Sequence, residues 1–238
     1  MEVHGTTLLC MVIKDGEEEH AIVASDSLMR LGTMRFPTPS EKIFDLDSSN
    51  SVVAGAGNAD FIKSTAAALE NQIEENREFL NKSDPILVAR TLEMMLCIPK
   101  YKGVDDTIFI IAGWQPEEGP HVYVIDSKGS RLFEQFKNFG PTGFKHLLGS
   151  GAMRQVNHYL DQGYRYEMSL QEALDLAESV ICFASTLDRG TGGLVHVRYL
   201  SRNTLRRQSP RDIANLVENK YKEVFQQFLN GGYSSMEE

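Results

Sequence analysis

The sequence predicts an α+β fold in which antiparallel sheets pack against helices that come in pairs. Three observations support this prediction. Apolar, β-rich runs fill the first part of the chain, two helical stretches follow one after the other, and strands followed by two helices come again in the second half. A doubly wound sheet would instead alternate single strands with single helices. Because no linker, internal repeat or low-complexity segment divides the 238 residues, we expect one domain.

The first elements are predicted to be strands. A β-rich run at 6–14 and an apolar run at 21–27 flank the polar stretch 15–20, which indicates a hairpin. Apolar and polar residues alternate at 42–47, as they do in a half-buried strand. Another apolar run, at 50–60, ends in small residues.

Two helices are predicted next. Residues 60–80 carry apolar side chains near helical spacing, with charged residues between them. The second helix covers 83–96, with Ser83 or Asp84 as its N-cap and Pro85 in its first turn. The apolar positions of the first helix are Phe61, Ile62, Leu69, Ile73 and Leu80.

The second half of the chain repeats the order of strands and paired helices. Ser169 and Glu172 are spaced as a capping box, which predicts a helix start at that point. The segment 230–238 has the composition of a frayed tail. The expected elements are strands at 106–114 and 121–136, helices at 151–161 and 169–187, a hairpin at 194–208 and a last helix from 209 to about 229.

Composition excludes several classes of protein. A net charge of −9 argues against a nucleic-acid partner, since phosphate binding needs clustered Lys and Arg. The longest apolar runs fall short of the roughly 20 residues that span a bilayer, and Met1 to Gly5 do not form a secretory signal. Cys10, Cys97 and Cys182 lie far apart, as buried free thiols of a reducing compartment do. We expect a cytoplasmic protein, also nuclear if eukaryotic, with no membrane partner.

Common metal and cofactor motifs are absent from the sequence. The six histidines show no HExxH or other metal-ligand spacing. The stretch GAGNAD has Asp60 where a dinucleotide loop needs its third glycine, and GSGAM lacks the GK[ST] of a phosphate loop. There is no GxSxG elbow. No metal and no cofactor is therefore expected.

The opening stretch MEVHGTTLLC admits two interpretations. Thr6 is either an ordinary residue of the first strand or a nucleophile released by cleavage after Gly5. Cleavage would place a free α-amine, with an ordinary pKa of about 7.7–8.0, beside the hydroxyl of the same residue. Such an enzyme also needs a buried Lys to lower the pKa of the hydroxyl, a carboxylate to hold that Lys, and backbone N–H groups for the oxyanion. The residues alone leave both interpretations open.

Six short motifs resemble, in order and over nearly the whole chain, the β subunit of the 20S proteasome. Sixteen positions separate Asp26 from Lys42 and fourteen separate Lys42 from Ala56, which matches the family's spacing for the acid, the lysine and the oxyanion residue. Each motif alone is weak, whereas six in order are specific. The motifs are Thr6 after Gly5, ASDS, KIF, AGAGNAD, GSG and DRGTGG.

The resemblance implies a more specific fold than the pattern of elements does. It implies a four-layer αββα sandwich of two antiparallel sheets between helix layers, the fold of N-terminal-nucleophile hydrolases. It divides the chain into a short propeptide at 1–5 and a single peptidase domain at 6–238. An α subunit of the same family would carry an extra N-terminal helix, for which Met1 to Gly5 are too short, so the resemblance is to the β type.

The resemblance assigns a role to each site residue. Thr6 would attack the scissile carbonyl and form an acyl-enzyme. Asp26 and Lys42 would form the buried pair beside its hydroxyl, although taken alone they would pass for a turn Asp and a surface Lys. Ser150 and Asp188 would surround the α-amine; taken alone they would pass for a helix N-cap and a helix-end or loop Asp.

The sequence departs from the family's pattern at several positions. Ala56 stands where the oxyanion N–H usually belongs to Gly, which keeps the donor if φ stays negative. Thr191 replaces a frequent Ser and keeps the hydroxyl. Arg30 replaces a Thr that usually lines the substrate channel, and the first hairpin has a longer, acidic turn. Because of these departures, the usual pairing of the substrate backbone with this part of the chain is not expected to carry over unchanged around Arg30.

The resemblance also places a pocket for the substrate side chain before the cleaved bond. Its lining is mostly apolar and carries no charge, which predicts cleavage after large apolar residues, or after smaller ones if Phe44 narrows the pocket. The lining positions, with Arg30 beside them, are Met29, Ser40, Phe44, Ala54 and Asn58.

The resemblance therefore implies a threonine endopeptidase that acts on unfolded polypeptide. The resemblance implies as partners other β subunits in a homo- or heteroheptameric ring, proteasome α subunits and a regulatory ATPase. Two alternatives remain: a non-catalytic β subunit, which the joint presence of Thr6, Asp26, Lys42, Ser150 and Asp188 disfavours, and a two-ring bacterial-type protease, whose chains usually lack the long C-terminal helix. A small-amide amidase fits the spacing less well.

Overall fold

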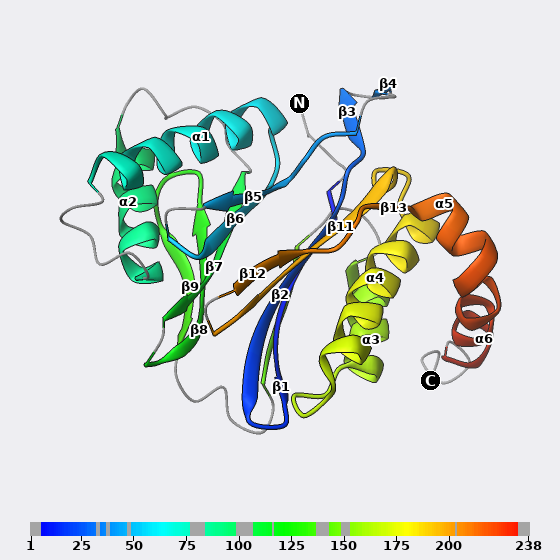
Figure 1. Cartoon of the computed structure of the whole chain (residues 1–238). Coiled ribbons are helices and arrows are strands. Elements are labelled where there is room, and N and C mark those ends of the chain that lie inside the picture. Colours follow the sequence, from blue (N-terminus) through cyan, green and yellow to red (C-terminus); the bar gives the residue numbers. More distant parts are fainter. Residues whose placement is uncertain are drawn as a thin grey trace.

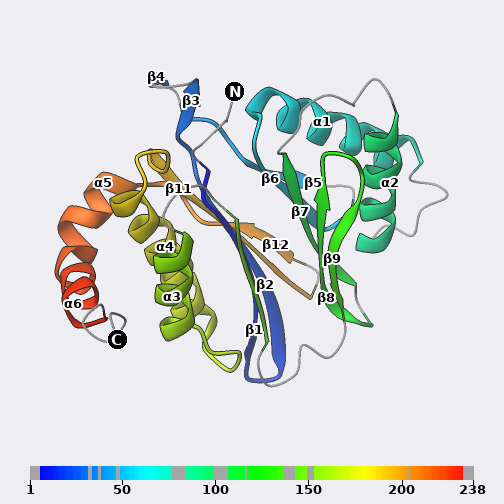
Figure 2. The same ribbon diagram turned by 180° about the vertical axis from the view of Figure 1, so that it is seen from behind.

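Two antiparallel sheets lie face to face between two layers of helices in the computed structural model (Figure 1). Helices α1 and α2 cover the outer face of one sheet, and α3 and α4 cover the outer face of the other, as the reverse view also shows (Figure 2). The prediction of a four-layer αββα sandwich is confirmed. The residues described are 6–31, 34–36, 39–46, 49–76, 84–98, 107–115, 117–136, 143–148, 153–202 and 204–232.

The first sheet is built around the N-terminal hairpin. Its strand order is β10-β1-β2-β11-β12, with β13 also paired to β11. Because β1 and β2 lie inside the sheet, the hairpin is paired on both sides. The strands are β1 (Leu8–Asp15), β2 (Glu18–Asp26), β10 (Phe144–Leu148), β11 (Leu194–Ser201), β12 (Thr204–Arg207) and β13 (Arg211–Asp212).

The second sheet runs in sequence order, β5-β6-β7-β8-β9. A separate two-stranded sheet, formed by β3 (Met29–Leu31) and β4 (Met34–Phe36), follows β2 at the end of the molecule where β1 begins (Figure 1). The strands of the second sheet are β5 (Ile43–Leu46), β6 (Ser51–Ala56), β7 (Ile108–Gln115), β8 (Gly119–Asp126) and β9 (Arg131–Phe136).

Two helices, α2 and α4, begin at N-cap residues that the sequence analysis proposed. Asp84, not Ser83, is the N-cap of α2, and Ser169 and Glu172 form the predicted capping box of α4. The last helical segment starts at Ile213 rather than at 209, because Arg211 and Asp212 pair with β11 first. The helical elements are α1 (Ala59–Glu75), α2 (Pro85–Cys97), α3 (Met153–Gly163), α4 (Leu170–Leu187), α5 (Ile213–Leu216), a π-helical segment (Val217–Tyr221) and α6 (Lys222–Gly232).

Three hydrophobic cores lie between the four layers. Strand β1 shows how one strand serves two of them: Leu9, Met11 and Ile13 pack toward α3 and α4, whereas Leu8, Cys10 and Val12 pack between the sheets. Successive side chains of a strand point to opposite faces, so a strand in the middle of the sandwich is apolar at every position. The third core, between the second sheet and α1 and α2, includes Leu69, Leu92 and Phe109.

Two details of the strands differ from the prediction. The expected polar turn 15–20 is a turn of two residues, Gly16 and Glu17, and Glu18 already begins β2. Gly16 has φ +63°, which a glycine adopts without strain, so the hairpin closes tightly and both strands lengthen. Strand β10, which the sequence analysis did not identify, is five residues long and forms by pairing with β1.

Candidate active site

Asp26 lies at the end of β2 and is the central acceptor of the candidate site. Its Oδ1 accepts hydrogen bonds from Lys42 Nζ at 2.8 Å and from the Thr7 amide at 2.9 Å. Its Oδ2 accepts from the backbone N–H groups of Leu28 at 3.0 Å and Gly192 at 3.2 Å. All four partners are donors, which is the arrangement that an ionised carboxylate satisfies. Asp26 thus ties together the start of β1, the residues after β2, Lys42 and the segment before β11.

Burial shapes the electrostatics of this pair. The Asp26 side chain is 0% exposed and that of Lys42 is 6% exposed, and their N–O distance is 2.8 Å. Burial lowers the pKa of Lys42, and the Asp26 carboxylate opposes that change. Burial also raises the pKa of Asp26, against which the Lys42 ammonium and two backbone N–H groups act. Each charge is therefore stable in this interior because the other is present.

Thr7 connects this pair to the candidate nucleophile. Besides the amide bond to Asp26, the Thr7 carbonyl accepts from the Asp26 N–H at 3.2 Å, and its Oγ1 lies 2.8 Å from Thr191 Oγ1. The peptide unit between Thr6 and Thr7 is planar, so fixing the Thr7 nitrogen also fixes the Thr6 carbonyl carbon. The half-buried Thr6 is thereby held within a few bonds of the carboxylate oxygen that binds Lys42.

The segment between α4 and β11 forms the other wall of the site. Asp188, the C-cap of α4, accepts from the Gly190 N–H at 2.8 Å, and Thr191 Oγ1 lies 3.4 Å from its second oxygen. The structure therefore brings Asp188 and Thr191 to the side of Thr7, and their roles around an N-terminal amine stay predictions. The hydroxyl of Thr191 takes part in both contacts, which the frequent serine of the family would also allow.

Ser27 and Gly193 fix that segment against β2. The Ser27 hydroxyl accepts from the Leu194 N–H at 2.7 Å, and the Ser27 N–H donates to the Gly192 carbonyl at 3.2 Å. Gly193 has φ +79°, and a Cβ there would come within 2.6 Å of Ser27 Oγ. Only glycine combines that backbone conformation with such a close approach. Gly192 and Gly193, the last two of the three glycines of DRGTGG, thus hold the wall of the site against β2.

Ala56 ends β6 opposite Ile108 of β7. Among the described residues, the one non-glycine position with a positive φ is Asn50, so Ala56 meets the condition set for an alanine at the oxyanion position. The next residue, Gly57, has φ +132° and makes the unusual turn toward α1. The Gly55 amide donates to the Lys42 carbonyl at 3.0 Å, which joins β6 to the segment that carries Lys42.

The residues predicted to line a side-chain pocket have different environments. Ala54 is fully buried between the sheets, and the half-buried Phe44 packs toward the core under α1. Asn58 is the N-cap of α1, since its side-chain oxygen accepts from the Phe61 N–H at 2.9 Å. The Ser40 amide donates to the Ser27 carbonyl at 2.9 Å, beside Asp26. Ser40 precedes β5, which carries Phe44, and Asn58 follows β6, which carries Ala54. These placements do not test the predicted pocket.

Part of the predicted site lies outside the described residues. Gly5, the expected cleavage point, and Ser150 are both in segments that the structure does not describe. For Met29 and Arg30, the structure describes the backbone of β3 and not the side chains. Their assigned roles stay predictions.

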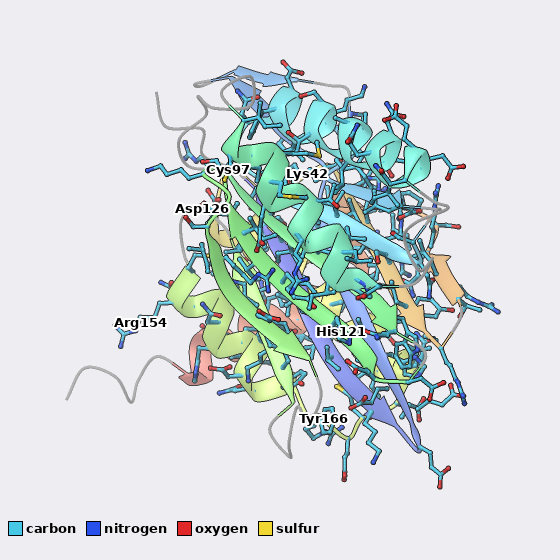
Figure 3. All side chains as sticks on the ribbon, turned by 90° about the vertical axis from the view of Figure 1, so that its left-hand side faces the viewer. Lys42, Cys97, His121, Asp126, Arg154 and Tyr166 are labelled. Atoms are coloured by element: carbon cyan, nitrogen blue, oxygen red, sulfur yellow. The ribbon has the colours of Figure 1, made fainter. Side chains whose placement is uncertain are left out.

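The site lies at one end of the sandwich. Figure 3 places Lys42 in the upper half of the view and Tyr166, which contacts the β1–β2 hairpin, at the lower end. Within the described residues, no group of three or more His, Cys, Asp or Glu side chains could hold a metal ion. In the same part of the chain, no helix combines the length and the apolar character needed to cross a membrane.

Chemically, the arrangement suits nucleophilic catalysis by a threonine whose amine becomes free. The Lys42–Asp26 ion pair lies beside the backbone of Thr7. The Thr191 hydroxyl contacts the Thr7 hydroxyl and links it to the Asp188 carboxylate. Sequence analysis missed Thr7 and Ser27, which orient the predicted residues. The doubled threonine in GTTLLC and the second hydroxyl of ASDS were visible, but nothing in the local pattern indicates which partners those hydroxyls find.

Comparison with known proteins points in the same direction. Residues 2–200 match the family described as "Proteasome subunit". The chain is 29% identical over 218 residues to "Proteasome subunit beta type-5" of Gallus gallus, which covers 90% of this chain and 77% of that protein. It is 28% identical over 222 residues to "Proteasome subunit beta type-5-A" of Arabidopsis thaliana, covering 91% and 73%. It is 25% identical over 225 residues to "Proteasome subunit beta type-8" of Rattus norvegicus, covering 93% and 74%.

Proposed function

The chain belongs to the proteasome subunit family, and from this premise we propose that it is a self-processing threonine endopeptidase. In this proposal it is a catalytic β subunit that hydrolyses peptide bonds of unfolded proteins inside a ring-shaped chamber. The proposed partners are other β subunits, α subunits and a regulatory ATPase, and the proposed setting is the cytoplasm. Cleavage after large apolar residues is part of the proposal.

One observation carries the proposal. A single carboxylate oxygen, Asp26 Oδ1, accepts from both Lys42 Nζ and the amide that directly follows Thr6. A buried ion pair of this kind is costly to form and is stable only with complete hydrogen bonding. A structural subunit would gain nothing from keeping a charged Lys beside this backbone position. A nucleophile would gain an electrostatic field that favours its ionised hydroxyl.

The proposed reaction is an acyl transfer. The Thr6 hydroxyl oxygen bonds to the scissile carbonyl carbon while its proton passes to the free α-amine of the same residue. The C–N bond then breaks, and the amine returns the proton to the leaving group, which gives an ester on Thr6. Water hydrolyses that ester by the same proton path. The Ala56 N–H is the proposed donor to the oxyanion, and the Lys42 charge stabilises the attacking oxygen.

The reaction requires a free amine on Thr6, so processing is the first test. In the assembled protein, intact mass should show loss of residues 1–5. Thr6→Ala should keep them, because it removes the attacking hydroxyl, whereas Thr6→Ser should still lose them, since a primary hydroxyl can attack. Hydrolysis of fluorogenic peptides with a large apolar residue before the cleaved bond should follow the same order among the variants.

The outcomes separate the alternatives. A wild-type chain that enters rings and keeps its first residues would contradict the active-enzyme proposal and favour a structural subunit. Loss of residues 1–5 from both wild type and Thr6→Ala would show that another protease removes them.

A further inference from the structure

Two buried polar side chains beside the candidate site have no hydrogen-bond partner among the described residues. They are Ser25, which is 0% exposed, and His196, which is 8% exposed. Within the part of the chain that the structure describes, neither Ser25 Oγ nor either ring nitrogen of His196 has a hydrogen-bond partner. Orphaned polar atoms are expensive in a protein interior, and three of them on two residues are rarely left without a ligand.

The strand register places these two side chains next to each other. His196 of β11 is directly opposite Ser25 of β2, and the neighbouring pair in the same ladder is Val195 with Asp26. Ala21 and Val23 of β2 and Leu200 of β11 pack between the sheets. Side chains alternate along a strand, so Ser25 and His196 face the same interlayer space. By the same alternation Asp26 starts from the opposite face of β2, so what links His196 to the pair is electrostatic: the charges of Asp26 and Lys42 both act on the imidazole.

Charges of both signs surround the imidazole. Arg198 follows on the same face of β11 and binds Asp45 of β5 at 2.9 Å and Glu41 at 2.7 Å. Burial is the main cause that lowers the pKa of His196. Arg198 and Lys42 act in the same direction, while Glu41 and Asp26 oppose them. The imidazole is thus neutral near pH 7 and offers one N–H donor and one acceptor.

We propose that Ser25 and His196 hold an internal water molecule between the two sheets, and that His196 is thereby a positioning residue for the Asp26–Lys42 pair. The residues fit this ligand, because a buried water typically makes about three hydrogen bonds to otherwise unsatisfied polar groups. Ser25 Oγ and a ring nitrogen supply two of them. The hydroxyl can donate or accept, so the water has partners of both kinds.

The proposed water affects the pair through solvation. A neutral imidazole and a water molecule are dipoles, so they can solvate nearby charges without adding a charge of their own. Replacing them with hydrocarbon would increase the burial effect that already lowers the pKa of Lys42. Lys42 would then lose its proton at a lower pH, and the field at the candidate nucleophile would weaken with it.

Three variants test this inference in the assembled protein. His196→Phe removes the polar atoms and keeps a planar ring, Ser25→Ala removes one water ligand, and His196→Gln keeps a donor and an acceptor. For His196→Phe, the alkaline limb of peptide hydrolysis should move to lower pH by about half a unit or more. Ser25→Ala should move it in the same direction by less. His196→Gln should stay close to wild type, and so should the control His158→Gln on α3.

A second readout does not depend on catalysis. A high-resolution crystal structure should show a water within hydrogen-bond distance of Ser25 Oγ and a His196 nitrogen, which Ser25→Ala displaces or shifts. The kinetic readout rests on the proposed function, but this one does not. An inactive wild type with the water in place would contradict only the proposed function. Equal pH shifts in His196→Phe and His196→Gln, or no water between Ser25 and His196, would overturn the inference.

Discussion

At the scale of single residues, the candidate site depends on side chains that orient others. Asp26 contacts four donors, and only one of them, Lys42, is a side chain. Thr7 supplies an amide, a carbonyl and a hydroxyl to the site. Thr7, the neighbour of Thr6 in sequence, therefore fixes the backbone that carries Thr6.

The Thr7 hydroxyl is the residue-scale feature that is most directly testable. Thr7→Val keeps the shape of the side chain but removes the 2.8 Å contact with Thr191 Oγ1. We expect kcat/KM for peptide hydrolysis to fall by about tenfold, because losing one buried hydrogen bond, worth roughly 1–1.5 kcal/mol, loosens the alignment of Thr6 with Thr191. Steady-state kinetics on the assembled protein measures the effect.

Thr65→Val is the matched control for that substitution. Thr65 lies on α1 and is 1% exposed or less, like Thr7, but its hydroxyl finds no hydrogen-bond partner among the residues that the structure describes. Removing an unpaired buried hydroxyl should leave activity unchanged and stability equal or higher. A Thr7→Val variant that behaved like Thr65→Val would contradict the role given to Thr7.

At the scale of elements, local signals placed the helices well and the short strands poorly. The caps at Asp84 and Ser169 depend on residues within three positions of each other, so the sequence alone can predict them. Strand β10 has five residues and is formed by pairing with β1, more than a hundred residues earlier. No local pattern contains that partner, which is why the sequence analysis did not identify the strand.

The capping box of α4 gives a prediction at this scale. Ser169 Oγ accepts from the Glu172 N–H at 3.3 Å, and the Glu172 carboxylate accepts from the Ser169 N–H at 2.9 Å. Ser169→Ala should lower the melting temperature by about 2–4 °C, since α4 covers the central strands of the first sheet. Thermal unfolding measures the shift.

Ser64→Ala provides the comparison, because Ser64 is an exposed position inside α1. Alanine has the higher helix propensity there, so this variant should unfold at the wild-type temperature or slightly above it. Equal losses in the two variants would mean that the capping box adds no stability of its own.

At the scale of the whole molecule, the four layers bury ionisable groups as well as apolar ones. His20, His146 and His196 are each buried enough that their pKa lies below the ordinary value. In the unfolded chain these rings regain a pKa of about 6.5 and bind protons more readily. The contribution of these neutral histidines to the free energy of unfolding is therefore complete above about pH 6.5. It is lost as the pH falls below that value, because the unfolded state then binds more protons than the folded state.

This linkage predicts an acid-sensitive fold. The melting temperature should fall between about pH 7.5 and pH 5.5, and His196→Gln, which cannot be protonated, should make the fall shallower. Comparing both proteins at both pH values cancels any effect of the substitution that is independent of pH. An identical fall in the variant would show that His196 does not take part.

The local pattern of the chain determined the class of the fold, the starts of α2 and α4, and the family, because these depend on order, spacing and near neighbours. Only the tertiary structure decided that one strand packs into two cores, that β10 pairs with β1, and that Asp26 accepts from Thr7, Leu28 and Gly192. Those contacts link positions up to 166 residues apart. Their energies come from burial and closed hydrogen bonding, which exist only once the layers have packed.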